Sequence, residues 1–263
     1  MEGWSGEEDL VKVALVQHDL AFEDSARTLA HLAPLVDEAA ANGTELVVLT
    51  EMFATGFSMA TDRVAERAGD GPGARFLLEA AARTKAVVAG SLPVFESGGR
   101  RPVNRFLFAA PDGTVVSYDK IHPFSYGGED RHYEAGDKVA FLRVGGVALT
   151  PFVCYDLRFA DIFWGAAERT DAYVLVANWP ASRQAHFRAL AVARAIENQA
   201  YVLATNRVGS GGGIDYAGGT IAIDPLGEVL AEAGREEETL HVEVDPARVA
   251  AVRDRYRFLA DRR

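Results

Sequence analysis

Cysteine and positive charge are both scarce in this chain, and each shortage excludes a class of protein. Cys154 is the only cysteine among 263 residues, so no disulfide can form within the chain, and we expect a reducing compartment, the cytoplasm. The formal net charge of -11 disfavours nucleic acid and anionic membrane surfaces as partners. We therefore expect neither kind of partner.

Long apolar runs, linkers and low-complexity tracts are also missing. No uninterrupted apolar run approaches the roughly 18 residues that a membrane helix needs. The first ten residues are acidic and have no apolar segment, so we expect no secretory signal. The glycine-rich segment 209–213 is too short and badly placed to separate domains. With 49% hydrophobic and 25% charged residues, residues 1–263 are expected to form a single globular domain.

Short apolar runs that suit buried strands alternate with helical patterns along the chain. Strands are expected near residues 11–20, 45–51, 86–95, 104–110, 115–120, 147–154, 172–179 and 200–208, with a hairpin over 218–232. Helices are expected over 25–42, 74–84, 161–169 and 184–198. For the first helix, Ser25 can serve as the N-cap and Gly43 as the C′ residue.

The chain also repeats itself. The stretch "ELVVLTEMF" matches "AYVLVANWP", "AVVAGSLPV" matches "AYVLATNRV", and "LFAAPDGTVVS" matches "IAIDPLGEVLA". Such internal duplication decides the architecture. Strands buried on both faces, alternating with helices in two similar halves, predict an α/β fold in which two packed sheets carry helices on the outside.

Three of the expected strands end in a residue that can do chemistry: Glu51, Lys120 and Cys154. Taken singly, a glutamate or lysine at a strand end is more often a capping or solvated group, and a lone cysteine more often packs in the core. Catalytic groups collect where the strands of α/β sheets end. Together the three supply a nucleophile, a general base and a cation for a developing oxyanion.

At these residues the sequence resembles the nitrilase, or carbon-nitrogen hydrolase, superfamily, from Lys12 to about Tyr256. The Glu-Lys-Cys triad of that family matches the three strand-end residues in motif and order. The segments "ANWPASR", "ARAIENQAYV" and "NRVG" resemble the omega-amidase branch, and "CYDLRF" is typical of amidases rather than of true nitrilases. Ala160 departs from the pattern, because many members have proline there.

The resemblance implies a four-layer α-β-β-α sandwich and hydrolysis of the terminal amide of a small 2-oxo acid. It implies no metal or organic cofactor. It also implies a second glutamate on the loop before the Ala-Gly-Asp of residues 135–137; Glu129 has the matching spacing, and Glu134 is the less favoured candidate. Family members usually dimerise through outer helices, for which Ile162, Phe163 and Ile196 offer apolar side chains.

In the mechanism that this implies, Glu51 is the general base for the Cys154 thiol. The Lys120 ammonium and the backbone N–H of Tyr155 form the oxyanion hole. Glu129 positions the substrate and supports the charge network. The product of the first step is a thioester on the cysteine.

The far end of the substrate needs side chains of its own. Phe57, Phe124 and Trp179 could wall a small pocket, with core packing as the alternative for each. A substrate carboxylate needs a specific cation in so acidic a chain, and the candidates, each beyond a strand end, are Arg158, Arg183 and Arg207. The alternative for Arg158 is a buried pair with Asp156 or with groups near Glu51.

Other functions remain open at this point. A papain-like Cys-His hydrolase would use His122, His132 or His186, but no matching signature surrounds Cys154, and these histidines lack metal-ligand spacing. Within the family, a nitrilase, an N-carbamoyl amidohydrolase or a deaminated-glutathione amidase is an alternative. A catalytically silent protein that binds a small molecule or a partner is another.

Overall fold

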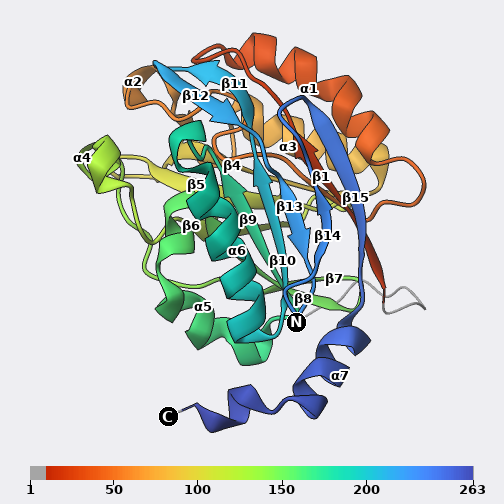
Figure 1. The fold of residues 1–263 in the computed structure, drawn as a ribbon. Coiled ribbons are helices and arrows are strands. Elements are labelled where there is room, and N and C mark those ends of the chain that lie inside the picture. The colour runs from red at the N-terminus through yellow and green to blue at the C-terminus, as the bar shows by residue number, and fades with distance from the viewer. Residues whose placement is uncertain (1–9, 263) are drawn as a thin grey trace.

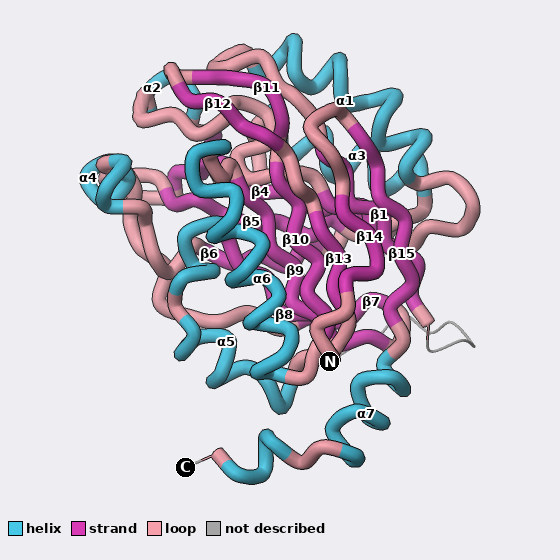
Figure 2. The backbone as a smooth tube through the Cα atoms, in the orientation of Figure 1, coloured by secondary structure: helices cyan, strands magenta, loops and turns pink. Residues whose placement is uncertain are grey.

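Two β-sheets pack face to face in this protein, and helices cover their outer faces (Figure 1). The computed structural model describes residues 10–262, so most of the N-terminal segment in which no secretory signal is expected lies outside the described residues. Figure 2 shows the strands gathered in the centre of the molecule with helices on either side. The arrangement confirms the predicted four-layer α-β-β-α sandwich.

The first sheet has the strand order β15-β1-β2-β4-β5-β6, with β3 paired to β4. Its strands are β1 (Val11–Gln17), β2 (Leu46–Val48), β3 (Glu66–Arg67), β4 (Val87–Phe95), β5 (Val103–Ala109), β6 (Val115–Asp119) and β15 (Glu238–Val244). The second sheet has the order β14-β13-β10-β9-β8-β7. Its strands are β7 (Leu142–Val144), β8 (Val147–Val153), β9 (Ala172–Ala177), β10 (Tyr201–Asn206), β13 (Ile221–Ile223) and β14 (Val229–Glu232).

The two sheets repeat one pattern of pairing, which confirms the duplication predicted from the sequence. In the first sheet β1, β2 and β4 are parallel, and β5 and β6 follow antiparallel. In the second sheet β8, β9 and β10 are parallel, and β13 and β14 follow antiparallel. Each sheet also gains an antiparallel strand on its first parallel strand, β15 on β1 and β7 on β8.

Alternation along the strands builds the layers. Val13 and Leu15 of β1 pack in the core between the sheets, whereas Ala14 and Val16 pack in the core that the helices cover. Both faces of these strands are therefore buried, and this is why they read as unbroken apolar runs in the sequence.

The helices are α1 (Ser25–Ala39), α2 (Thr61–Val64), α3 (Pro72–Thr84), α4 (Glu129–His132), α5 (Ala160–Ala166), α6 (Gln184–Asn198) and α7 (Pro246–Arg255). Helices α1 and α3 contact the first sheet, and α6 contacts the second sheet and α5. Within residues 10–262, no helix has the length and apolar character needed to cross a membrane.

Several local expectations need correction. The N-cap of α1 is Asp24, whose side chain accepts a hydrogen bond from the Arg27 N–H at 3.1 Å, rather than Ser25. Helix α1 ends at Ala39, so Gly43 lies in the following turn and not at C′. The glycine-rich segment 209–213 forms the end of a hairpin, β11 (Val208–Gly211) and β12 (Ile214–Ala217).

Candidate active site

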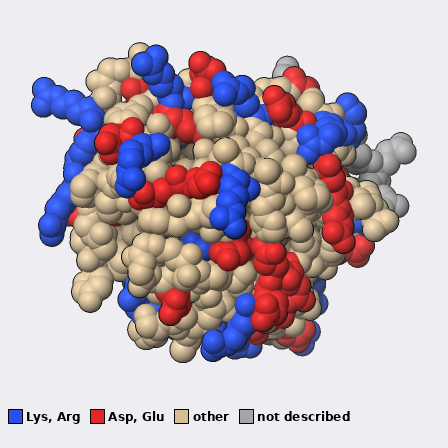
Figure 3. Space-filling model, turned by 90° about the horizontal axis from the view of Figure 1, so that it is seen from above, with Lys and Arg blue, Asp and Glu red and all other residues tan. Residues whose placement is uncertain are grey.

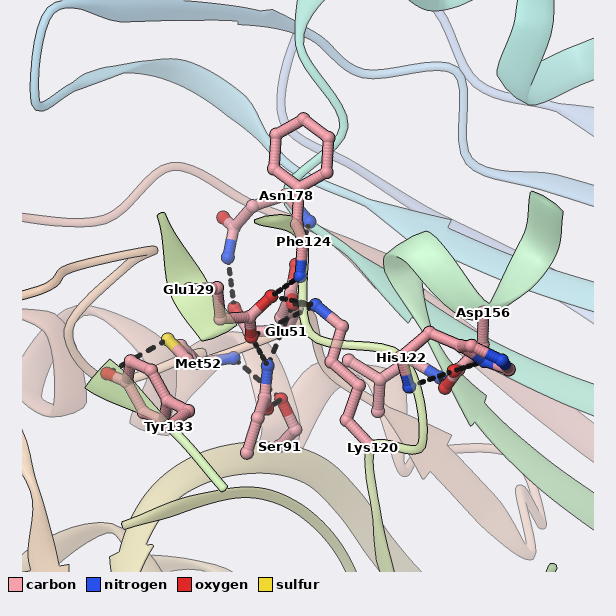
Figure 4. Close-up of polar contacts among 12 residues, drawn as sticks. Glu51, Met52, Ser91, Lys120, His122, Phe124, Glu129, Tyr133, Asp156 and Asn178 are labelled. Carbon is pink, nitrogen blue, oxygen red and sulfur yellow. Dashed lines mark hydrogen bonds and ion pairs between the residues drawn. The ribbon is translucent and has the colours of Figure 1, made fainter. Parts of the chain in front are cut away.

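Glu51, Lys120 and Glu129 meet in a buried ion-pair network at one end of the sheets (Figure 4). Lys120 lies directly after β6, whereas Glu51 lies in the turn after β2. The Lys120 Nζ is 2.9 Å from Glu51 Oε1 and 2.8 Å from Glu129 Oε2. None of the three side chains is more than 1% exposed. The structure thus brings together one cation and two carboxylates away from water.

The charges in this network stabilise one another. Burial disfavours a charged lysine, but the carboxylates of Glu129 and Glu51 outweigh it and raise the pKa of Lys120 well above its ordinary value. Burial raises the pKa of Glu129, while the Lys120 charge acts in the opposite direction. Lys120 is therefore an ammonium at neutral pH and is unsuited to act as a base.

Two asparagines that sequence reasoning missed orient the Glu51 carboxylate. Asn104 Nδ2 donates to Glu51 Oε1 at 2.9 Å and to Glu129 Oε1 at 3.2 Å. The Ser91 hydroxyl donates to Asn104 Oδ1 at 2.8 Å and so fixes the orientation of the amide. The Asn178 backbone N–H donates to Glu51 Oε2 at 2.8 Å. Hydrogen-bond donors therefore hold both oxygens of the Glu51 carboxylate.

The loop after β6 places Glu129, and not Glu134, beside the lysine. Glu129 begins the short helix α4, and its Oε2 accepts the Phe124 N–H at 2.6 Å. Glu134 instead pairs with Arg101 at 2.8 Å, and both of these side chains are partly exposed. Of the two candidates, only Glu129 belongs to the buried network.

Cys154 sits at a sharp turn directly after β8. Its backbone φ of +46° lies in the left-handed region, which is unusual for a residue with a side chain and marks a strained position. Burial and the neighbouring charge of Glu51 raise the pKa of the Cys154 thiol well above its ordinary value. The resting residue is therefore a thiol, and attack by its sulfur requires a base that takes the proton.

A cavity of about 40 Å³ lies beside this thiol. It is lined by Phe57, Phe124, Cys154, Tyr155, Arg158, Asn178, Trp179, Pro180, Arg183, Ile214 and Tyr216. A wider recess of about 680 Å³ shares part of this lining, including Phe57, Phe124 and Arg183. The three aromatic residues expected to wall a pocket all line the cavity.

Two of the three expected arginines also line the cavity. The Arg158 guanidinium lies 4.9 Å from the Trp179 ring, and that of Arg183 lies 5.5 Å from the Phe124 ring. Arg158 also contacts His186 Nδ1 at 3.3 Å. Among residues 10–262, neither guanidinium forms an ion pair with a carboxylate. The cavity therefore has positive charge that no acidic side chain neutralises.

Two expectations about the arginines need correction. Arg207 does not line the cavity: it is fully buried, and its guanidinium pairs with Asp19 at 2.7 Å. The alternative ion pair between Arg158 and Asp156 does not form either. The Asp156 carboxylate instead accepts a hydrogen bond from the Tyr118 hydroxyl and contacts His122 Nδ1. Within the described residues there is no group of three or more His, Cys, Asp or Glu that could hold a metal ion.

Comparisons with known proteins identify the family and the fold of the chain. The carbon-nitrogen hydrolase family matches residues 12–254. The chain is 37% identical over 248 residues to the omega-amidase YafV of Escherichia coli K12, covering 94% of each protein. It is 32% identical over 247 residues to the 2-oxoglutaramate amidase of Bacillus subtilis 168, covering 92% of this chain and 93% of that protein. The crystal structure of XC1258 from Xanthomonas campestris, a CN-hydrolase superfamily protein with an arsenic adduct in its active site, superposes with a TM-score of 0.90 at 34% identity over 97% of both chains.

Proposed function

Because the chain belongs to the carbon-nitrogen hydrolase family and is an amide-hydrolysing enzyme, we propose that it is an omega-amidase. Its substrate would be the terminal amide of a small 2-oxo acid such as 2-oxoglutaramate or 2-oxosuccinamate. The products are ammonia and the dicarboxylate. The observation that carries the proposal is the pair of unneutralised guanidiniums, Arg158 and Arg183, in the cavity beside the Cys154 thiol.

The first half of the reaction forms a thioester. Glu51 takes the thiol proton as the Cys154 sulfur attacks the amide carbon. A base is needed at this step because the raised pKa of Cys154 keeps the resting thiol protonated. The negative charge on the amide oxygen is stabilised by the Lys120 ammonium and by the Tyr155 backbone N–H. Glu51 then gives its proton to the departing amine, and ammonia leaves.

The second half releases the acid. Glu51, again a carboxylate, removes a proton from water as the water attacks the thioester carbon. The C–S bond then breaks, and Glu51 returns the proton to the departing sulfur, which restores the Cys154 thiol. Glu129 supports the Lys120 charge and helps to position the amide. Each step is a proton transfer or an acyl transfer that these side chains supply, so the mechanism uses no cofactor. A thiol that must stay reduced favours the cytoplasm as the working compartment.

The carboxylate end of the substrate explains the need for arginine. Acidic side chains gather in a band on the face seen in Figure 3, and a chain with net charge -11 repels an anion in general. A guanidinium stacked on an aromatic ring keeps its edge N–H groups available for a carboxylate. Arg183 and Arg158 are placed to receive that group in the cavity.

We expect 2-oxoglutaramate to be hydrolysed with a kcat/KM roughly 10³-fold or more above that of butyramide, because a site built to pair a polar group rejects analogues that lack it. Arg183→Met should remove most of this preference by lowering kcat/KM for 2-oxoglutaramate while butyramide changes little. The preference is measured as the rate of ammonia release from five compounds assayed side by side: 2-oxoglutaramate, butyramide, glutamine, an aliphatic nitrile and an N-carbamoyl amino acid.

Arg188→Met is the matched control, because Arg188 is an exposed arginine of α6 that pairs with Glu232 and does not line the cavity. It should leave the preference unchanged. If the nitrile or the carbamoyl compound has the highest kcat/KM, the protein is not an omega-amidase. That result would leave the proposal that Cys154 is the nucleophile unaffected.

We also propose a homodimer formed through the outer face of α5 and α6. Ile196 and Trp164 are about half exposed there, and Leu230 of β14 adds a third exposed apolar side chain. Phe163 cannot contribute as first expected, because it is fully buried and packs against Phe152 in the core. Light scattering that gives the mass of a monomer at micromolar concentration would exclude the dimer.

A further inference from the structure

We propose that Asp156 is a positioning residue whose buried carboxylate holds the turn of Cys154 against the segment of Lys120. The inference rests on the thiol chemistry of the proposed function, because it concerns how the Cys154 thiol is positioned relative to Glu51, its base, and to the Lys120 ammonium. Asp156 lies two residues after the nucleophile, is fully buried, and does not line the cavity.

Four hydrogen bonds converge on this one carboxylate. Its Oδ1 accepts from the His122 backbone N–H at 3.0 Å and contacts His122 Nδ1 at 2.9 Å. Its Oδ2 accepts from the Tyr118 hydroxyl at 2.7 Å and from the Val153 backbone N–H at 3.0 Å. The Tyr118 oxygen in turn accepts the Ile121 N–H at 3.2 Å. Every donor comes from one of two short segments.

These two segments carry the reacting groups from different sheets. Residues 118–122 leave the first sheet at the end of β6 and contain Lys120. Residues 153–156 leave the second sheet at the end of β8 and contain Cys154. Figure 4 shows His122 and Asp156 beside Lys120, on the side away from Glu51 and Glu129. The Asp156 carboxylate therefore joins the two halves of the molecule next to the nucleophile.

A stack of rings extends this connection to the proposed oxyanion hole. The His122 ring lies parallel to the Phe159 ring, with centroids 3.7 Å apart and planes 9° apart. Phe159 meets the Tyr155 ring edge-on at 5.1 Å. Tyr155 supplies the backbone N–H assigned to the oxyanion, so a shift of the His122 segment would also move this donor.

Only a carboxylate suits this position. It accepts on both oxygens and donates nothing, whereas an asparagine amide would direct N–H groups at one pair of the surrounding donors. A buried carboxylate is tolerated because these donors replace water. The left-handed backbone of Cys154 needs such support, since a residue with a side chain leaves that conformation unless its surroundings hold it there.

The test is Asp156→Asn, with Tyr118→Phe as a milder variant that removes one donor. We measure kcat and KM for the preferred amide and the second-order rate of Cys154 alkylation by iodoacetamide. Misplacement of a reacting group by about 1 Å can cost on the order of 10²-fold. We expect Asp156→Asn to lower kcat and the alkylation rate by roughly 10- to 100-fold at an unchanged KM, and Tyr118→Phe to lower both by a smaller factor.

The matched control is Asp224→Asn. Asp224 is also a buried carboxylate that accepts two backbone N–H groups, at 2.8 and 2.9 Å, but it lies in the turn between β13 and β14. This variant should keep both rates within about twofold of the wild type even if its melting temperature falls. The positioning role is overturned if folded Asp156→Asn retains wild-type rates, or, should that variant not fold, if Tyr118→Phe does. If alkylation of the wild type leaves ammonia release intact, the thiol mechanism fails instead.

Discussion

Cys154→Ser is expected to lose ammonia release by on the order of 10⁴-fold or more, the scale for loss of a covalent nucleophile. A serine hydroxyl has a far higher pKa than a thiol, so Glu51 would have a much harder proton to remove. Serine is nearly the same size and stays next to the cavity, so the fold should be kept. Ammonia release and a circular dichroism melt measure the two halves of this prediction.

Near-normal turnover by Cys154→Ser would contradict the mechanism. The wild type treated with iodoacetamide provides an independent comparison, because it blocks the same sulfur without changing the gene product. Both proteins should be inactive for the same reason. Activity in one and not in the other would show that the loss comes from bulk or from misfolding rather than from the nucleophile.

The charged partners give the second large effect. Glu51→Gln should lower kcat by on the order of 10²-fold or more, the scale for loss of a general base. Lys120→Ala should cost a similar factor through the oxyanion. It should also destabilise the fold by roughly 3–5 kcal/mol, because Glu51 and Glu129 would be left buried without their counter-charge. Rates must therefore be measured at a temperature at which circular dichroism shows each variant to be folded.

Glu129 and Glu134 provide a graded pair for this second prediction. Glu129→Gln should affect the attack step less than Glu51→Gln does and should act more through the positioning of the substrate. Glu134→Gln should be close to wild type, because Glu134 is exposed and pairs with Arg101 outside the network. A silent Glu129→Gln beside an inactive Glu134→Gln would mean that the loop has been assigned wrongly.

The elements that the sequence predicted well are those whose signal is local. Helix α6 spans the predicted Gln184–Asn198 because its apolar positions recur at helical spacing. The parallel strands were found because burial on both faces leaves an unbroken apolar run. By contrast, the sequence patterns do not predict β15 or α7. Strand β15 alternates buried and exposed residues at the edge of its sheet, a weaker signal than a continuous apolar run.

The residues of the site also divide into those with a local sequence signal and those without one. Residues at strand ends, Glu51, Lys120 and Cys154, could be proposed from position and residue type. Asn104 could not, because it lies at the start of an antiparallel strand, and only the register of β5 against β6 brings it beside Lys120, whose N–H donates to the Asn104 carbonyl at 2.9 Å. Its place near a strand end also made Arg207 a candidate, but position alone does not show which partner a side chain meets. The Arg207 guanidinium pairs with Asp19 instead.

The central claim is that Cys154 forms an acyl-enzyme from the amide of a 2-oxo acid, and partition between two nucleophiles tests it most directly. Hydroxylamine is added during hydrolysis of succinamate and, separately, of monomethyl succinate; both keep the carboxylate but lack the 2-oxo group, which hydroxylamine would convert to an oxime. The ratio of hydroxamate to free acid is measured for each, with Cys154→Ser as the blank. If both substrates acylate the thiol, one thioester is shared between hydroxylamine and water, and the two ratios are equal. Ratios that differ between the amide and the ester would contradict the account, because they would mean that no common acyl-enzyme exists.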